Sequence, residues 1–154
     1  NVKATKIGGT TDISAGQLLD RTGQLLELPF PSGKHLDALS KTASDKTVFK
    51  VKCPGLEFSL SGVQNKVEQY HRDHGDPAET AAYALRCVAN AVITATRNAQ
   101  KQYPGLEVVF SGGVASNSML RELTKPLKPV FALPQYSTDN AMGVAILAHR
   151  LLEG

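Results

Sequence analysis

Two adjacent glycines followed by an asparagine form the stretch of this sequence best suited to bind a ligand. Gly112 and Gly113 follow Ser111, which ends the mainly apolar stretch 106–110, and Asn117 stands where a helix is expected to begin. Glycines let a ligand approach the backbone closely, and the first N–H groups of a helix have no partner within it. The Asn117 side chain carries both a donor and an acceptor, which suits a purine edge or a ribose. The alternative is an ordinary strand–turn–helix joint in which Asn117 is only the N-cap.

Three carboxylates are the other candidates for binding. Asp139 follows an expected strand at 130–133 and begins an expected helix, where it can ligate a metal or cap the helix. Asp20 lies in the first expected helix, Gly33 in the turn after it, and Asp37 one helical turn further on. The two acids can hydrogen-bond ribose hydroxyls, although carboxylates exposed to solvent are the commoner case.

Several standard catalytic and phosphate-binding motifs are absent. Gly33-Lys34 matches the end of a P-loop, but Leu28 stands where its first glycine belongs. No G-x-S-x-G occurs and no serine has a lysine three residues on, so a serine nucleophile is not supported. The two histidines and two aspartates of 71–76 fit no standard zinc spacing, and we interpret this stretch as a polar connection.

The elements expected to position these residues alternate between helices and strands. The first expected helix begins at Asp12 or Ser14 and ends at the turn that starts with Pro29. Further helices are expected at 34–43, 77–102, 117–123 and 139–152. The expected strands are 47–52, 57–60, 106–110 and 130–133. A continuous apolar strand between helices favours a parallel sheet covered on both faces. The sequence therefore predicts a single α/β domain.

Two helix starts carry capping signals. Ser14 and Gln17 have the spacing of a capping box, in which each side chain bonds the backbone N–H of the other residue. Asp76, Pro77 and Glu79 combine an N-cap, a proline in the first turn and an acid three residues after the cap. The helix that begins at Pro77 is expected to be the longest.

Composition limits the class of protein. The chain has 154 residues, 42% of them hydrophobic and 20% charged, which excludes disorder. No apolar run approaches the ~20 residues of a membrane span, so no membrane partner is expected. Cys53 and Cys87 are too few to staple a secreted scaffold, so we expect reduced thiols and a cytoplasmic location. A formal charge of +3 permits a nucleic-acid partner without demanding one.

Four spaced motifs together resemble one family. They are TDISAG at 11–16 with Asp20, LPFPSG at 28–33, EFSLSG at 57–62, and GGVASN at 112–117 with STDNA at 137–141. Their order and spacing resemble the C-terminal half of the TsaD/OSGEP proteins, historically called O-sialoglycoprotein endopeptidases or glycoproteases. The resemblance runs over nearly the whole chain, and the last two motifs are the most specific.

The resemblance implies the actin/sugar-kinase fold, which is ribonuclease H-like, with a mixed sheet flanked by helices. It implies transfer of threonylcarbamoyl from its adenylate to an adenosine of tRNA, with ATP or threonylcarbamoyl-adenylate bound, and possible partner subunits in a hetero-oligomer. By resemblance the nucleotide pocket is formed by Asp20, Gly33, Asp37, Gly112, Gly113 and Asn117. Asp20, Gly33 and Asp37 would meet the ribose, and Asn117 would meet the base. Asp139 would ligate a divalent metal, iron or zinc.

The sequence also departs from the family pattern. Its H-x-x-x-H metal motif is not formed by any of the four histidines, Gln17 stands where Glu is usual, and SGVQN at 61–65 replaces S-G-L-K-T. We therefore expect residues 1–154 to be a single C-terminal nucleotide-binding lobe, inactive alone, with the other metal ligands on an N-terminal lobe that this chain lacks. The alternative is a non-catalytic paralogue that acts as a binding or scaffold subunit. A metal-dependent glycoprotein endopeptidase ranks last.

Overall fold

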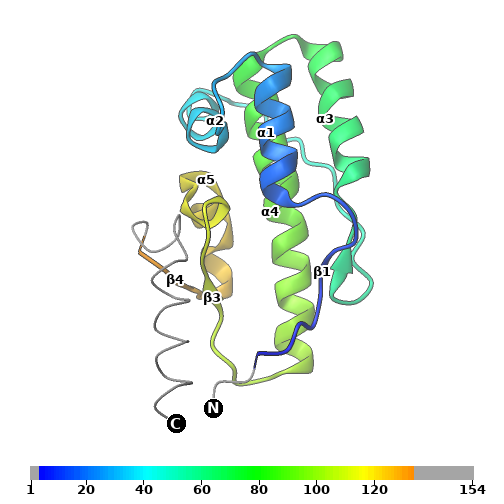
Figure 1. The fold of residues 1–154 in the computed structure, drawn as a ribbon, viewed down its shortest axis with the longest axis vertical. Helices are drawn as coiled ribbons and strands as arrows, with labels where there is room; N and C mark the ends of the chain where they lie inside the picture. The colour runs from blue at the N-terminus through cyan, green and yellow to red at the C-terminus, as the bar shows by residue number, and fades with distance from the viewer. Residues whose placement is uncertain (1–3, 134–154) are drawn as a thin grey trace, which may run out of the picture.

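A long central helix, α4 (Pro77–Gln102), is the element against which the other helices pack. The computed structural model describes residues 4–133. In Figure 1 helix α1 lies in front of the upper half of α4, with α3 on one side, α2 on the other side and α5 below α2. The further helices are α1 (Ala15–Leu25), α2 (Gly33–Ser40), α3 (Ser61–His74) and α5 (Ser118–Thr124).

The core lies where the first half of α4 meets the other helices. Several alanines of α4 and its one leucine are fully buried, among them Ala81, Ala84 and Leu85, each with 0% exposure. Small alanines let neighbouring helices approach α4 closely, and Leu18 of α1 and Leu36 of α2 fill the space between them. The expectation that this helix is the longest is confirmed.

Both capping signals are confirmed. The Ser14 hydroxyl accepts from the Gln17 N–H at 3.1 Å, and the Gln17 side chain accepts from the Ser14 N–H at 2.8 Å. At the start of α4 the Asp76 carboxylate accepts from the Glu79 N–H at 3.0 Å. Local side-chain bonds of this kind satisfy N–H groups that have no partner within the helix.

Two small parallel sheets take the place of the larger sheet that we expected. Within residues 4–133, β1 (Gly9–Thr10) pairs only with β2 (Glu57–Phe58), and β3 (Val109–Phe110) only with β4 (Val130–Phe131). In register, Gly9 lies opposite Glu57, and Val109 opposite Val130. The described part of the chain is thus a mixed α/β structure that is mostly helical. The expected helix at 139–152 lies outside the described residues.

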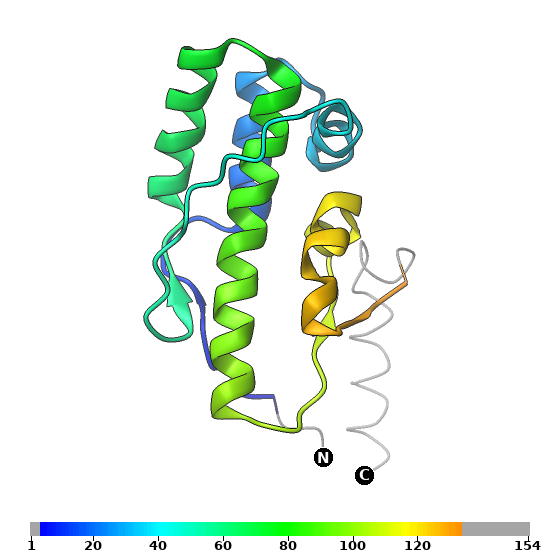
Figure 2. The same cartoon turned by 180° about the vertical axis from the view of Figure 1, so that it is seen from behind.

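The expected strand at 47–52 is wrong. This segment is extended, but it crosses the face of α4, as Figure 2 shows, and pairs with side chains rather than with a strand. The N–H of Phe49 donates to the Cys87 sulfur at 3.3 Å, and the N–H of Val51 donates to the Asn90 side-chain oxygen at 2.9 Å. Alternating hydrophobicity marks an extended segment with one buried side and does not say what satisfies its backbone.

The interpretation of 71–76 as a polar connection is also wrong, because most of it belongs to α3. Val63, Val67 and Tyr70 form the buried stripe of this helix, with the i, i+4, i+7 spacing of one helical face. Gly75, with φ of 67°, ends the helix in the left-handed conformation that favours glycine. This stripe was the signal in the sequence that could have identified α3.

Candidate functional site

A cavity of about 360 Å³ lies between α1, α2 and the loop 113–117. Its wall includes five of the predicted site residues, namely Asp20, Gly33, Asp37, Gly113 and Asn117. Gly112 is not part of this wall, and Asp139 lies outside the described residues. A second cavity of similar volume, near Ile7 and Tyr103 at the far end of α4, contains none of the predicted residues.

Asp20 links α1 to the turn before α2, and these two segments form part of the cavity wall. One oxygen of its carboxylate accepts a hydrogen bond from the Ser32 N–H at 2.9 Å. The backbone of α1 comes close to Ser32 at Gly23, where an added Cβ would lie 2.0 Å from the Ser32 hydroxyl oxygen. Ser32 itself is 2% exposed. The contact therefore requires glycine at position 23, and it sets the position of Gly33 at the cavity wall.

Asp37 joins α2 to the start of α5. Its carboxylate accepts hydrogen bonds from the Ser118 N–H at 3.0 Å and the Ser118 hydroxyl at 2.7 Å, and a longer one of 3.4 Å from the Met119 N–H. A carboxylate at the first N–H groups of a helix is favoured by the helix dipole. Asp37 therefore holds the residue directly after Asn117.

Asn117 is the N-cap of α5, as the alternative interpretation of the sequence expected. Only one of the two polar atoms of its side chain takes part in the cap. Its oxygen accepts from the Leu120 N–H at 3.0 Å. The Asn117 side-chain nitrogen is buried and has no hydrogen-bond partner within residues 4–133, and the same is true of the Ser116 hydroxyl oxygen. A buried polar atom without a partner costs free energy, so such atoms mark places where a ligand or water completes the structure. Both residues line the cavity.

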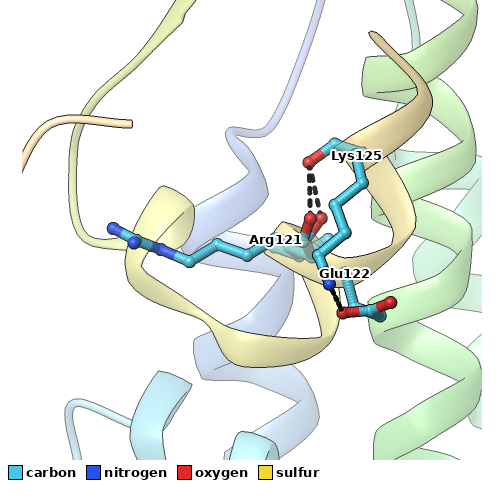
Figure 3. Close-up of polar contacts among 5 residues, drawn as sticks. Arg121, Glu122 and Lys125 are labelled. Carbon is cyan, nitrogen blue, oxygen red and sulfur yellow. Dashed lines mark hydrogen bonds and ion pairs between the residues drawn. The ribbon is translucent and has the colours of Figure 1, made fainter. Parts of the chain in front are cut away.

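The loop that carries Asn117 is shaped by Gly112 and held by Arg121. Gly112 has φ of 97°, which side-chain-bearing residues rarely adopt. The Arg121 guanidinium donates to the Ala115 carbonyl at 2.9 Å and to the Ala132 carbonyl at 3.2 Å, and it lies over the Phe131 ring. In Figure 3 Arg121 extends to the opposite side of α5 from the Glu122–Lys125 ion pair. Arg121 thus ties the loop to the end of β4.

The motifs TDISAG and EFSLSG meet at Asp12, away from the cavity wall. The Asp12 carboxylate accepts from the hydroxyls of Ser59 and Ser61 at 2.5 and 2.6 Å and from the Leu60 N–H at 2.8 Å. Partial burial acts to raise the pKa of Asp12, but the hydrogen bonds from Ser59, Ser61 and Leu60 outweigh it and hold that pKa below its ordinary value. Asp12 therefore stays ionised and joins the segment after β1 to the start of α3.

Six residues of the cavity wall were not predicted from the sequence as site residues, and two of them have polar side chains. Lys34, at the second position of α2, and Ser116, in the short 3₁₀ turn Val114–Ser116, both belong to the wall. Lys34 directly follows the predicted site residue Gly33, and this adjacency is the sequence feature that could have identified it. Nothing local in the sequence distinguishes Ser116 from the chain's other serines.

The described residues contain no group of three or more histidine, cysteine, aspartate or glutamate side chains able to hold a metal. The histidines of α3 have structural partners instead. A ring nitrogen of His71 lies 3.0 Å from the Thr80 hydroxyl, and one of His74 lies 2.9 Å from the Tyr70 carbonyl oxygen.

Comparison with known proteins places the chain in a family. Residues 2–146 match the family model of TsaD, described as tRNA N6-adenosine threonylcarbamoyltransferase. The chain belongs to this family, whose fold is the actin-like ATPase fold. Within residues 4–133 no helix is long and apolar enough to cross a membrane.

Curated relatives with that same name cover much of the chain. The protein of Carboxydothermus hydrogenoformans is 33% identical over 96% of this chain and 48% of its own length. That of Enterococcus faecalis is 34% identical over 75% of this chain and 36% of its own length. That of Mycoplasmopsis agalactiae is 28% identical over 96% of this chain and 51% of its own length. The chain thus spans between about a third and a half of the length of these relatives.

Proposed function

We propose that the cavity between α1, α2 and the loop 113–117 binds the adenosine part of a nucleotide. The observation that carries this proposal is the convergence of predicted nucleotide-binding residues from three separate segments on one cavity, with the Asn117 side-chain nitrogen buried there without a partner within residues 4–133. An amide N–H₂ group can donate to a ring nitrogen of adenine while the amide oxygen keeps its bond to Leu120.

The carboxylates suit the ribose. Asp20 uses one oxygen for the Ser32 N–H, and within residues 4–133 its other oxygen has no hydrogen-bond partner and can accept from a ribose hydroxyl. Asp37 already accepts from Ser118 with both oxygens, but each carboxylate oxygen has a further lone pair. Gly33 has no side chain in the way of the sugar, and the position that its Cβ would take is open, with nothing within 4 Å.

The reaction that we propose for the whole protein is the one named for the relatives, threonylcarbamoyl transfer to adenosine of tRNA. This chain would be its nucleotide-binding C-terminal lobe, acting in the cytoplasm with tRNA and with partner subunits. Asp139 would ligate a divalent metal, iron or zinc, which when bound would polarise the carbamoyl and phosphate oxygens. That role rests on the family resemblance.

The alternative of a non-catalytic scaffold was motivated by Gln17 and by Gln64-Asn65. Both glutamines have local structural roles. Gln17 completes the capping box of α1. The Gln64 side chain accepts from Arg21 at 2.6 Å and donates to Glu68 at 3.0 Å. These departures from the family pattern therefore have a structural explanation that does not require loss of activity. No proteolytic function is proposed, because the relatives' names describe a transferase.

The proposal is tested by calorimetric titration of the 154-residue chain with adenosine, with inosine for comparison. Asn117→Ser keeps a good N-cap but removes the amide, so we expect roughly fivefold weaker adenosine binding with nearly unchanged stability. Asn65→Ser, on the exposed face of α3, is the matched control and should bind as the original chain does. Affinity is expected to be weak, with Kd above about 1 μM, because on this proposal the N-terminal lobe of the whole protein would hold the rest of the ligand. No adenosine binding at millimolar concentration, or equal binding by Asn117→Ser, would contradict the proposal.

A further inference from the structure

The extended segment 46–53 is held firmly against one face of α4. In Figure 2 it passes in front of α4, from α2 towards the lower end of α3. Side chains of α4 bond its backbone: the Arg86 Nε donates to the Thr47 carbonyl at 2.9 Å, and the Asn90 side-chain oxygen accepts from the Val51 N–H at 2.9 Å. A segment held in this way presents its outward side chains in a fixed order along the surface.

Four lysines gather on this side of the molecule. Lys46, Lys50 and Lys52 of the segment are exposed, whereas the valine between the last two is 7% exposed. These three lysines are spread over up to about 20 Å of extended chain. Lys66 of α3 joins them, because its ammonium nitrogen lies 5.7 Å from the centre of the Phe49 ring. We call these four lysines the lysine surface.

Ion pairs do not neutralise the lysine surface. Within residues 4–133 no carboxylate lies within 4.0 Å of any of its four ammonium groups. The nearby carboxylates have other partners: Asp45 accepts from the Tyr70 hydroxyl at 2.5 Å, and Glu79 accepts from the Ser44 N–H at 2.7 Å. Arg86, 9% exposed under the segment, interacts electrostatically with Asp45 and offsets the charge of that carboxylate. The surface therefore keeps an excess of positive charge, which attracts a polyanion.

The form of the lysine surface limits the kind of polyanion. Phe49, 37% exposed, is the one exposed large hydrophobic residue of 41–53 and α3, so the broad apolar face that a membrane-surface helix inserts into lipid is missing there. The segment lies flat on α4, so it cannot enter the major groove of DNA as a helix or a two-stranded ribbon does. Cations placed along a line, with an aromatic ring among them, suit the phosphates and unpaired bases of an RNA strand.

We infer that the lysine surface binds the phosphate backbone of RNA. The inference goes beyond the proposed function, because none of the four lysines lines the adenosine cavity and no step of the transfer reaction depends on them. Where the proposed function holds, the RNA is the tRNA, and the lysine surface is the face of this lobe that contacts its backbone.

The test measures binding of a fluorescently labelled, unmodified tRNA transcript to the 154-residue chain by anisotropy. At about 100 mM NaCl we expect a Kd of about 1–100 μM, as for contacts made mainly to phosphates. Each phosphate that a lysine neutralises releases counterions, so the slope of log K against log [NaCl] should be about −2 to −4. A DNA duplex of similar charge and vesicles of equal parts phosphatidylcholine and phosphatidylserine are the competing polyanions.

Paired substitutions locate the contact. Lys50→Gln combined with Lys52→Gln should weaken tRNA binding roughly tenfold and make the salt slope shallower by about 2. Arginine at both positions should keep the affinity, since it keeps the charge. Lys101→Gln combined with Lys128→Gln is the matched control, because it removes the same charge from exposed residues outside the lysine surface, and it should change binding less than about twofold. Thermal melts of each variant establish that the fold is intact.

Three results would overturn the inference: no tRNA binding at low salt, equal binding by the Lys50/Lys52 double variant, or an equal loss in the Lys101/Lys128 control. Tighter binding of the DNA duplex or of the vesicles than of tRNA would overturn the choice of RNA as the partner. Adenosine titration of the same variants keeps the two proposals apart, because the Lys50/Lys52 variant should bind adenosine as the original chain does. A chain that binds tRNA through these lysines but not adenosine would contradict the proposed function and leave this inference standing.

Discussion

The carboxylate of Asp37 accepts hydrogen bonds from both the N–H and the hydroxyl of Ser118, at 3.0 and 2.7 Å, across 81 positions of sequence. This contact joins two walls of the candidate site, because Asp37 lies on α2 and Ser118 directly follows Asn117. The geometry of the cavity therefore depends on a long-range contact that no local pattern in the sequence predicts.

Replacing Asp37 by Asn should loosen that junction. The new amide N–H₂ group would face a donor of Ser118, so at least one of the two bonds is lost and the free energy of unfolding should fall by about 1–2 kcal/mol. Ser118→Ala removes only the hydroxyl and should cost less, about 0.5–1 kcal/mol. Urea unfolding of the 154-residue chain measures both. Equal stability of Asp37→Asn and the original chain would show that the contact does not hold α5.

Gly23 should be intolerant of a change that usually stabilises helices. An alanine is ordinarily better than glycine inside a helix by about 1 kcal/mol. At position 23, however, the added Cβ would lie 2.1 Å from the Cβ of Ser32, so Gly23→Ala should lower the free energy of unfolding by about 1–3 kcal/mol. Gly62→Ala in the first turn of α3 is the matched control, because nothing lies within 4 Å of its Cβ position. A Gly23→Ala chain as stable as Gly62→Ala would disprove the close contact.

Sequence reasoning succeeded where the determinants are local. The capping bonds of Ser14 and Asp76 span three residues, so they can be recognised directly from spacing. Helix α3 was missed because it begins at Ser61 without a side-chain cap and its C-terminal part is polar. Only three residues form its buried stripe, and the histidines and aspartates of 71–76 favoured a polar connection instead of a helix.

Family resemblance named five of the residues that line the cavity, while the sequence did not predict how they are arranged in space. The sequence places Asp20 and Asn117 nearly a hundred positions apart, and only the packing of α1, α2 and α5 around α4 brings them to one cavity. The unused donor of Asn117 likewise depends on burial, which composition and spacing do not reveal. The role of Asp139 stays a prediction.

Arg121 should matter for both stability and ligand binding. Arg121→Met removes two hydrogen bonds to loop carbonyls and the stacking on Phe131, so we expect about 1–3 kcal/mol lower stability and weaker adenosine binding. Arg121→Lys should not rescue it, because an ammonium group lacks the planar fork that reaches both carbonyls.

The neighbouring ion pair on α5 supplies the control for Arg121. Glu122 and Lys125 have side chains 68% and 66% exposed, and exposed pairs contribute little. Lys125→Ala should therefore leave unfolding and adenosine titrations nearly unchanged (Figure 3). Comparable losses in Lys125→Ala and Arg121→Met would show that α5 is sensitive to any substitution and that Arg121 has no special role.

The last prediction concerns pH and the bond between Tyr70 and Asp45. The Tyr70 hydroxyl donates to the Asp45 carboxylate at 2.5 Å, and the Tyr70 ring stacks between His74 and Tyr83. The hydrogen bond from Tyr70, with those from Thr47, holds the pKa of Asp45 below its ordinary value. Burial, followed by the bond to Asp45, raises the pKa of Tyr70 above its ordinary value.

These shifts have opposite consequences at the two ends of the pH range. A carboxylate with a lowered pKa stabilises the fold above its unfolded pKa, so the contribution of Asp45 is lost as pH falls below about 4. A tyrosine with a raised pKa stabilises the fold below its unfolded pKa, so the contribution of Tyr70 is lost as pH rises above about 10. The contribution of the bond should therefore be largest between these limits.

Tyr70→Phe tests this directly, because it removes the hydroxyl and keeps the ring. Near neutral pH its melting temperature should be roughly 3–6 °C below that of the original chain, and the gap should narrow below about pH 4 and above about pH 10. Tyr103→Phe is the control, since Tyr103 is 42% exposed and its hydroxyl has no hydrogen bond among the described residues. Thermal melts followed by circular dichroism across this range measure the gap. No gap near neutral pH would mean that Tyr70 stabilises the fold through its ring alone, and a gap that is constant with pH would mean that the hydroxyl acts through something other than its bond to the Asp45 carboxylate.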